Sequence, residues 1–177
     1  MRRLEKIVNI CNEMKVDAIL LTSEVNMHYA TMYPGFEGMV VIDIDGNGVC
    51  FTDSRYIEHA TKKIEPQGYK VIEPEGSYPT PKTIGDYIKK KGYTRVAFEN
   101  FCMSVAQLDA YRRTLSVELF PLENKIEKLR EIKEDIEIQW ITEAQRMAER
   151  SLNRLIPEIK VGAYEDELCA KLRYFMA

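Results

Sequence analysis

Short apolar runs alternate with amphipathic segments through the first 122 residues, and no other feature of the sequence constrains the fold as strongly. Residues 2–15 carry apolar side chains three and four positions apart, the spacing of a helix with one buried face. Residues 17–23 form a run apolar enough for a strand buried on both faces. Further helices are predicted at 25–31, 54–64, 82–91 and 104–115, and further strands at 39–43, 48–52, 69–72, 95–99 and 117–122. Ser54 and Ser104 are the expected N-caps of the helices that begin with them. This alternation predicts an α/β fold with a mixed sheet flanked by helices.

Asp45-Gly46 separates two of the predicted strands and is a strong signal for a tight β-hairpin. The same segment, which begins at Asp43, also matches the first half of an EF-hand calcium loop. The match fails at the twelfth position, where Ser54 stands in place of the bidentate glutamate of a calcium loop. Predicted strands rather than helices also flank the segment, so we interpret it as a hairpin turn.

The pattern changes after Pro121. Residues 125–176 contain no segment that resembles a strand, and apolar residues at helical spacing instead predict helices over 134–156 and 163–176. Two helices with apolar faces and no sheet of their own make up only part of a domain. We therefore expect an α/β domain over residues 1–122, followed over 123–177 by a linker and the first helices of a truncated second domain.

Charge and apolar content argue against two classes of partner. The chain has 25 Lys and Arg against 28 Asp and Glu, a net charge of −3, and no basic face that would neutralise a nucleic-acid backbone. Its apolar runs are far shorter than the roughly 20 residues that cross a bilayer, and its charged, amphipathic start does not resemble a signal peptide. We expect no nucleic acid and no membrane as partners.

The cysteines indicate the cellular compartment. Cys11, Cys50, Cys102 and Cys169 are far apart in the sequence and include no C-x-x-C pair. This spacing favours free thiols over a disulfide framework or a metal site, which indicates a reducing compartment. We therefore predict a cytoplasmic protein.

The sequence contains no recognisable catalytic or metal-binding constellation. His28 and His59 are the only histidines, and neither has a second histidine at the spacing of a metal site. No G-x-S-x-G motif and no Walker loop occurs. Residues 165–167 are consecutive acids that point about 100° apart on a helix, so stabilisation of the helix dipole explains them better than a shared ion. We assign no catalytic residue and no metal ligand.

Asp53, Arg55 and Tyr56 stand at a predicted turn from a strand to a helix. Asp53 can accept hydrogen bonds from the start of the helix while Arg55 pairs locally, which would lock the turn. Alternatively, Arg55 and Tyr56 can project beyond the domain toward a carboxylate. The residue chemistry by itself favours the structural role and leaves the second interpretation open.

Three sequence segments together resemble one known family. Ser23-x-x-Asn26-x-x-Tyr29-x-Thr31, then Gly38, then Phe51-Thr-Asp53-Ser-Arg55-Tyr56-x-x-x-Ala60 resembles the amino-terminal domain of the creatinase, prolidase and aminopeptidase P family. A second segment, Leu129-Arg-x-Ile-Lys133-x-x-x-Glu137-Ile138 followed by Ala144, resembles the entry into that family's pita-bread catalytic domain. A third, Gly162-x-x-Glu165-x-Glu-Leu168, resembles the next helix of that domain. One departure is Tyr29-Ala-Thr31-Met32-Tyr33, where many relatives have Tyr-Leu-Thr-Gly-Phe.

The resemblance implies a creatinase-type amino-terminal domain with a ribonuclease H-like mixed sheet, followed by the first two helices of a pita-bread domain. Enzymes of this family hydrolyse peptide bonds that precede proline. They use two divalent cations, often manganese or cobalt, held by two Asp, one His and two Glu. The corresponding positions would all follow Ala177, so the chain by itself is expected to hold no cofactor and to be inactive.

The resemblance also implies a homodimer in which the amino-terminal domain reaches toward the active site of a neighbouring subunit and its peptide substrate. Tyr29, Asp53, Arg55 and Tyr56 would there limit substrate access or contact the neighbour. The apolar faces predicted over 134–156 and 163–176 should pack on residues 1–122 or on a second copy, which also favours a dimer.

Two other functions within the same family remain open. One is a non-catalytic protein-binding relative, as in the histone-chaperone branch, although the chain lacks long acidic tracts. The other is a creatinase-like amidinohydrolase, which acts on a small guanidino compound. Because peptidases are the commoner members, an Xaa-Pro aminopeptidase or dipeptidase is the preferred assignment.

Overall fold

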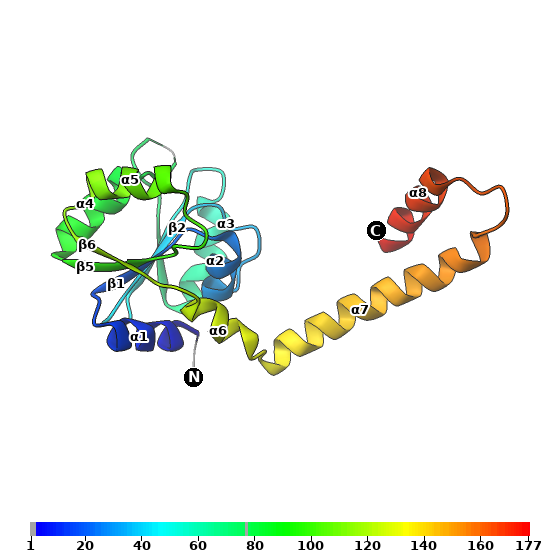
Figure 1. Cartoon of the computed structure of the whole chain (residues 1–177), viewed down its shortest axis with the longest axis horizontal. Coiled ribbons are helices and arrows are strands. Elements are labelled where there is room, and N and C mark those ends of the chain that lie inside the picture. Colours follow the sequence, from blue (N-terminus) through cyan, green and yellow to red (C-terminus); the bar gives the residue numbers. More distant parts are fainter. Residues whose placement is uncertain (1–2, 77) are drawn as a thin grey trace. The chain divides into compact units, whose positions relative to one another are not determined.

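The computed structural model describes residues 3–76 and 78–177. The chain divides into two compact units, Met1–Glu131 and Ile132–Ala177. The first unit is an α/β domain, and the second consists of helices and the turns that join them (Figure 1).

A six-stranded mixed sheet lies at the centre of the first unit, in the order β4-β3-β2-β1-β5-β6. The strands are β1 (Ala18–Leu21), β2 (Met39–Asp43), β3 (Gly48–Phe51), β4 (Tyr69–Ile72), β5 (Arg95–Phe98) and β6 (Glu118–Pro121). The pairs β1–β2 and β2–β3 are antiparallel, and the other three pairs are parallel. The prediction of a mixed sheet with one embedded hairpin is therefore confirmed.

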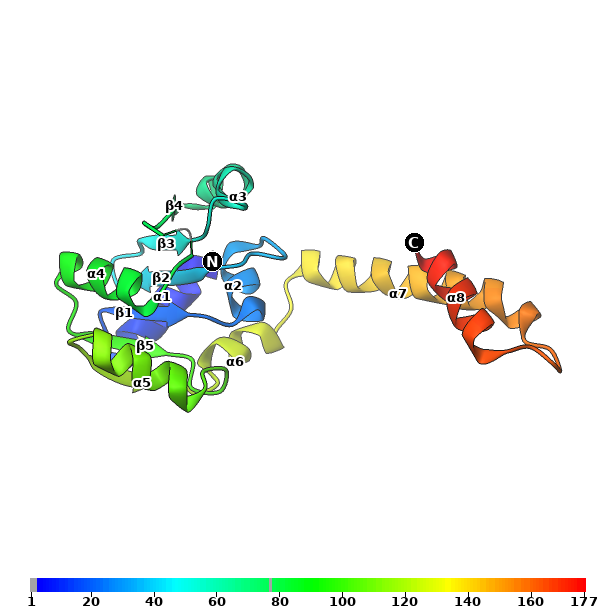
Figure 2. The same cartoon turned by 90° about the horizontal axis from the view of Figure 1, so that it is seen from above.

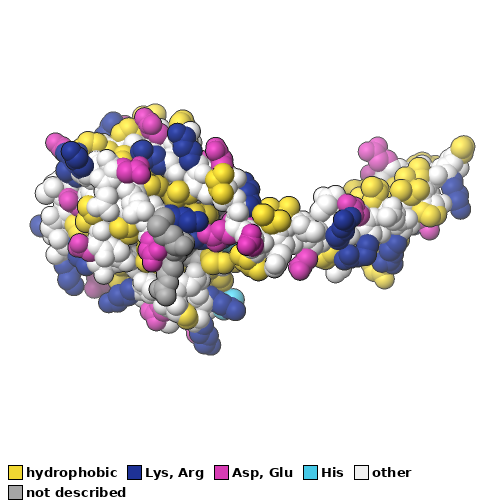
Figure 3. Space-filling model, turned by 90° about the horizontal axis from the view of Figure 1, so that it is seen from below, with side chains coloured by type: hydrophobic (Ala, Val, Ile, Leu, Met, Phe, Trp, Pro, Cys, Tyr) yellow, Lys and Arg dark blue, Asp and Glu magenta, His cyan; other side chains and the backbone are white. Residues whose placement is uncertain are grey.

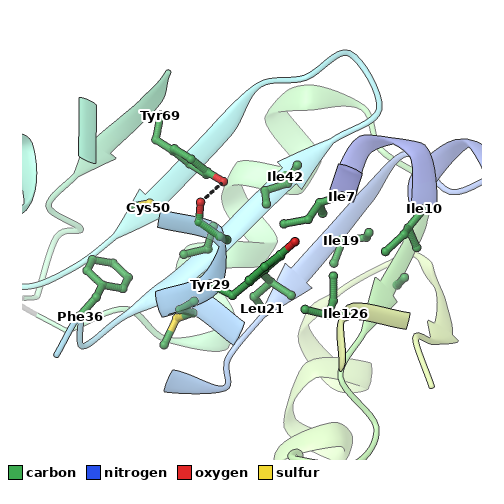
Figure 4. Close-up of a cluster of buried hydrophobic side chains, with 14 of the residues drawn as sticks. Ile7, Ile10, Ile19, Leu21, Tyr29, Phe36, Ile42, Cys50, Tyr69 and Ile126 are labelled. Atoms are coloured by element: carbon green, nitrogen blue, oxygen red, sulfur yellow. Dashed lines mark hydrogen bonds between the residues drawn. The ribbon is translucent and has the colours of Figure 1, made fainter. Parts of the chain in front are cut away.

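Helices cover both faces of this sheet (Figure 2). One face carries α1 (Arg3–Met14), α2 (Glu24–Thr31), α3 (Ile57–Ile64) and α6 (Lys125–Glu131), and the other carries α4 (Pro81–Lys91) and α5 (Val105–Thr114). Side chains alternate along a strand, so Ile19 and Leu21 enter the first core while Ala18 and Leu20 enter the second (Figure 4). The uninterrupted apolar run of β1 follows from this burial on both faces.

The structure corrects the predicted start of α3. Ser54 was expected to cap a helix over 54–64, but α3 begins at Ile57. The backbone nitrogens of Tyr56 and Ile57 both donate to the carbonyl oxygen of Asp53 at 3.1 Å, so the three residues before the helix form a tight turn. Ser104, by contrast, caps α5 as predicted, in a reciprocal capping box with Gln107.

The first unit extends beyond the predicted domain end at residue 122. The backbone nitrogen of Leu122 donates to the carbonyl oxygen of Phe98 at 2.8 Å, which continues the pairing beyond β6. Ile126 of α6 is fully buried in the core beneath α1 and α2. This burial places residues 123–131 with the α/β domain rather than with the helices that follow.

The second unit contains α7 (Asp135–Leu155) and α8 (Glu165–Met176), joined through a short 3-10 turn, η2 (Ile156–Glu158). The hydroxyl of Ser151 donates to the carbonyl oxygen of Phe175 at 2.9 Å, and Arg154 lies over the Phe175 ring. Apolar side chains remain exposed on both helices (Figure 3), among them Trp140, Ile141, Met147, Leu152 and Tyr174.

Candidate functional site

At the turn between β3 and α3, the exposed guanidinium of Arg55 is hydrogen-bonded to the buried carboxylate of Asp53. The side chain of Asp53 is 5% exposed, whereas that of Arg55 is 64% exposed. Asp53 Oδ2 accepts from Arg55 Nη2 at 2.7 Å, and Oδ1 accepts from Nε at 3.1 Å. Oδ1 also accepts from the backbone nitrogen of Arg55 at 2.9 Å. The same ion pair thus locks the turn and fixes the direction of the guanidinium.

Glu37 adds a second carboxylate that the sequence reasoning missed. Its Oε2 lies 3.4 Å from Arg55 Nη2. The guanidinium carbon of Arg55 lies 5.2 Å from the centroid of the Tyr56 ring, within cation–π distance. The one signal for Glu37 in the sequence is its place directly before Gly38, a position of the family motif.

A close approach between backbones brings Glu37 to this turn. The hydroxyl of Thr52 donates to the carbonyl oxygen of Glu37 at 2.7 Å. A Cβ atom at Gly38 would lie 2.0 Å from the carbonyl oxygen of Phe51, so a side chain at this position would collide with the end of β3. Gly38 therefore allows the loop to reach the turn.

Asp53 and Arg55 form a charged pair near neutral pH. Hydrogen bonding from Arg55 lowers the pKa of Asp53 below its ordinary value of 3.8, and the same hydrogen bonding raises the pKa of Arg55. The hydrogen bond to Glu37 is the main cause of a raised pKa at Tyr56. Arg55 Nη1 hydrogen-bonds no residue in the described part of the chain. A charged guanidinium with a free edge can bind a further carboxylate.

A pocket of about 240 Å³ adjoins the loop that carries Glu37. It is lined by Thr22, Glu24, Met27, Gly35, Phe36, Glu37, Gly38 and Tyr78. Its lining includes the carboxylates of Glu24 and Glu37 together with Met27, Phe36 and Tyr78. This composition suits a small ligand that carries positive charge.

Tyr29, the fourth residue singled out by the resemblance, lies away from this cluster. Its side chain is 4% exposed and packs in the core beneath α1, near Ile7 and Leu21 (Figure 4). Arg3 lies over its ring, 4.9 Å from the centroid. The structure thus brings together Asp53, Arg55 and Tyr56, and it places Tyr29 inside the domain.

A buried polar network explains another part of the family motif. Glu99 Oε2 accepts from the backbone nitrogens of Thr22 at 2.5 Å and Ser23 at 2.8 Å, where β1 leads into α2. Asn26 Nδ2 donates to Glu99 Oε1 at 2.6 Å and to Glu127 Oε1 at 2.8 Å. Burial raises the pKa of Glu99. The sequence pattern marked Ser23 and Asn26 but gave no sign of their acidic partners.

No group of three or more His, Cys, Asp or Glu side chains among the described residues is arranged to hold a metal ion. Among the described helices, none combines the length and the apolar character needed to cross a membrane.

Residues 3–132 match the family model of the Creatinase/Prolidase N-terminal domain. The chain belongs to this family. It is 32% identical over 175 residues to the uncharacterized peptidase YqhT of Bacillus subtilis, which covers 98% of this chain and 48% of that protein. The creatinase/prolidase assignment made from the sequence is therefore confirmed.

Two further similar proteins have names that state an activity. An Xaa-Pro dipeptidase of Pyrococcus furiosus is 26% identical over 180 residues, covering 98% of this chain and 47% of the dipeptidase. The structure of the Xaa-Pro dipeptidase from Bacillus anthracis matches with a TM-score of 0.89 at 28% identity, covering 98% of this chain and 48% of that one. The chain therefore spans about half the length of the curated relatives it matches.

Proposed function

We propose that this chain is the amino-terminal part of a longer protein, here called the parent, that hydrolyses peptide bonds preceding proline. The observation that carries the proposal is the match to an Xaa-Pro dipeptidase over 98% of this chain at a TM-score of 0.89. The similarity includes the second unit as well as the α/β domain. We attribute the chemistry to the part of the parent outside residues 1–177.

The two divalent cations of the proposed reaction, manganese or cobalt, would be held outside this chain. Such ions activate water and polarise the scissile carbonyl group. We assign none of their ligands to residues 1–177 and propose that this chain contributes to substrate access and to assembly.

We propose that Arg55 binds the carboxylate of a short peptide substrate. Asp53 fixes the guanidinium through Nε and Nη2, so little further ordering of the side chain is needed when a ligand binds. Nη1 then remains for the ligand, and Tyr56 supports the guanidinium from one side. A carboxylate bound there would fix one end of the substrate and limit its length.

We also propose that the parent is a cytoplasmic homodimer. In this arrangement Arg55 would face the active site of the neighbouring subunit. The exposed apolar side chains of α7 and α8 support a further contact, either with the rest of the parent or with the second subunit. Nucleic acid and membranes are not among the proposed partners.

A kinetic comparison in the parent tests the function and the role of Arg55. The substrates are Ala-Pro and its amide, which lacks the terminal carboxylate, assayed with added manganese. The variant Arg55→Gln is compared with Arg112→Gln, because Arg112 is exposed and its ion pair is with Asp109 on its own helix. We expect hydrolysis of Ala-Pro, with a KM about tenfold higher in Arg55→Gln and unchanged in Arg112→Gln.

The amide separates carboxylate recognition from general damage. If Arg55 binds the carboxylate, Arg55→Gln should alter the KM of the amide far less than that of Ala-Pro. An equal effect on both substrates would contradict the proposed role. Hydrolysis of creatine in place of Ala-Pro would contradict the peptidase function and favour an amidinohydrolase, and binding of histone peptides without any hydrolysis would favour a protein-binding relative.

A further inference from the structure

A groove of about 450 Å³ lies between α4 and the starts of β3 and β4. None of its lining residues belongs to the turn that carries Arg55, so it is distinct from the site described above. The volume falls within the range of small-molecule sites, roughly 300–1,000 Å³. It is a candidate binding site on a separate part of the first unit.

The floor of the groove is apolar and partly aromatic. Val49, Ile72 and Tyr87 line it; Val49 belongs to the buried cluster between the sheet and α4, and Ile72 and Tyr87 pack against that cluster. The Tyr87 ring makes edge contacts with Phe51, at 5.3 Å between centroids, and with Tyr93 at 6.4 Å. These contacts fix the ring, so the floor is a preformed surface for an apolar or aromatic group.

Three lysines line the same groove and no acidic residue does. Lys70 comes from β4, whereas Lys90 and Lys91 come from the last turn of α4. In the described part of the chain none of the three pairs with a carboxylate, and Lys91 Nζ lies 5.8 Å from the centroid of the Tyr87 ring. Other surface lysines do have partners: Lys62 pairs with Glu58 at 2.5 Å.

The concentration of positive charge is local, since the whole chain carries a net charge of −3. Cations that converge from two elements beside a low-dielectric wall raise the local concentration of anions. A doubly charged phosphate monoester, whose second pKa is about 6, would gain more from three ammonium groups than a single carboxylate would.

We propose that this groove binds a small aromatic phosphate monoester. The aromatic body lies on the floor formed by Val49, Ile72 and Tyr87, and the phosphate lies between Lys70 and the pair from α4. This site is independent of the proposed peptidase function, because it shares no residue with the Arg55 cluster.

Titration of the 177-residue chain with phenyl phosphate, followed by amide NMR, tests the site. We expect saturable shifts at Val49, Lys70 and Tyr87, with a Kd on the order of 1 mM. Phenol, which lacks the charge, and inorganic phosphate, which lacks the ring, should each bind about tenfold more weakly. Equal binding of phenol or of inorganic phosphate would overturn the proposal, as would the absence of local shifts up to about 10 mM phenyl phosphate.

Lysine variants supply a matched control. Lys90→Gln and Lys91→Gln should each raise the Kd of phenyl phosphate about threefold, and the double variant about tenfold. Lys89→Gln removes the same charge from the same helix turn, but Lys89 does not line the groove, so its Kd should stay within about twofold of the original. The three side chains are exposed, so the spectra of the free variants should match the original. An equal loss of affinity in Lys89→Gln would show a general effect of charge and overturn the site.

Discussion

Asn26 and Glu99 lie 73 positions apart in the sequence and share a buried hydrogen bond of 2.6 Å. The same amide nitrogen of Asn26 also donates to Glu127 at 2.8 Å. A single side chain therefore joins α2 to the residue after β5 and to α6. Since Glu99 is only 3% exposed, its carboxylate depends in place of water on hydrogen bonds from Asn26 and from the backbone nitrogens of Thr22 and Ser23.

Replacing Asn26 by Ala should strongly destabilise the first unit. The change leaves two carboxylates without a shared donor, and we expect the free energy of unfolding to fall by about 2–3 kcal/mol. Urea denaturation followed by circular dichroism measures the change. The control is Asn12→Ala, an exposed residue whose side-chain amide donates to the carbonyl oxygen of Val8 in the same helix, with an expected change below about 0.5 kcal/mol. Equal changes in both variants would contradict the role of the network.

The ion pair of Asp53 and Arg55 should make stability depend on pH in the acid range. The pKa of Asp53 is lower in the folded state than its ordinary value of 3.8, so below that value the unfolded state binds more protons. The contribution is present above pH 3.8 and is lost as the pH falls through the folded-state pKa. In Asp53→Asn, the free energy of unfolding should therefore fall less between about pH 5 and pH 3 than it does in the original chain.

Denaturation of the Asp53 variant at both pH values measures this effect. Asp109→Asn is the control, since the side chain of Asp109 is 48% exposed and lies 3.5 Å from its partner Arg112. The control should retain the acid sensitivity of the original chain. Unchanged acid sensitivity in Asp53→Asn would show that the ion pair does not contribute.

Substitutions at Gly38 and Gly92 should distinguish the cost of a steric collision from the cost of an unfavourable backbone conformation. In Gly38→Ala the new Cβ would lie 2.0 Å from the carbonyl oxygen of Phe51, and we expect a loss of more than about 3 kcal/mol. Gly92 has a φ of +74° with no atom near its Cβ position, so Gly92→Ala should cost only about 1 kcal/mol. Urea denaturation of both variants gives the comparison, and a similar loss in both would contradict the close approach.

The extent of the first unit can be tested with two isoleucines that are close in the sequence. Ile126 is fully buried, so Ile126→Ala should lower the free energy of unfolding by about 2–5 kcal/mol. Ile132 is 78% exposed, and Ile132→Ala should change it by less than about 0.5 kcal/mol. A small effect of Ile126→Ala would indicate that α6 is part of a linker, as the sequence predicted, and not part of the first unit.

Local patterns predicted the elements because the residues that mark them lie within short segments. The run that became β1 is apolar throughout, which matches a strand buried on both faces. Ser104 caps α5 through bonds with Gln107, three residues away. Ser54 failed as a cap because the carbonyl oxygen of Asp53 binds the backbone nitrogens that the hydroxyl would have served. The sequence alone does not decide between two such local partners.

By itself the sequence determined the mixed α/β fold, the hairpin at Asp45-Gly46 and membership of the family, since periodicity, turn residues and motif spacing lie within short segments. The tertiary structure decided which distant side chains meet. The strand order, with β1 between β2 and β5, brings Glu99 to Asn26, and the loop before β2 brings Glu37 to Arg55. The physical reason is that these contacts depend on non-local strand pairing and packing, which leave no periodic signal in the chain.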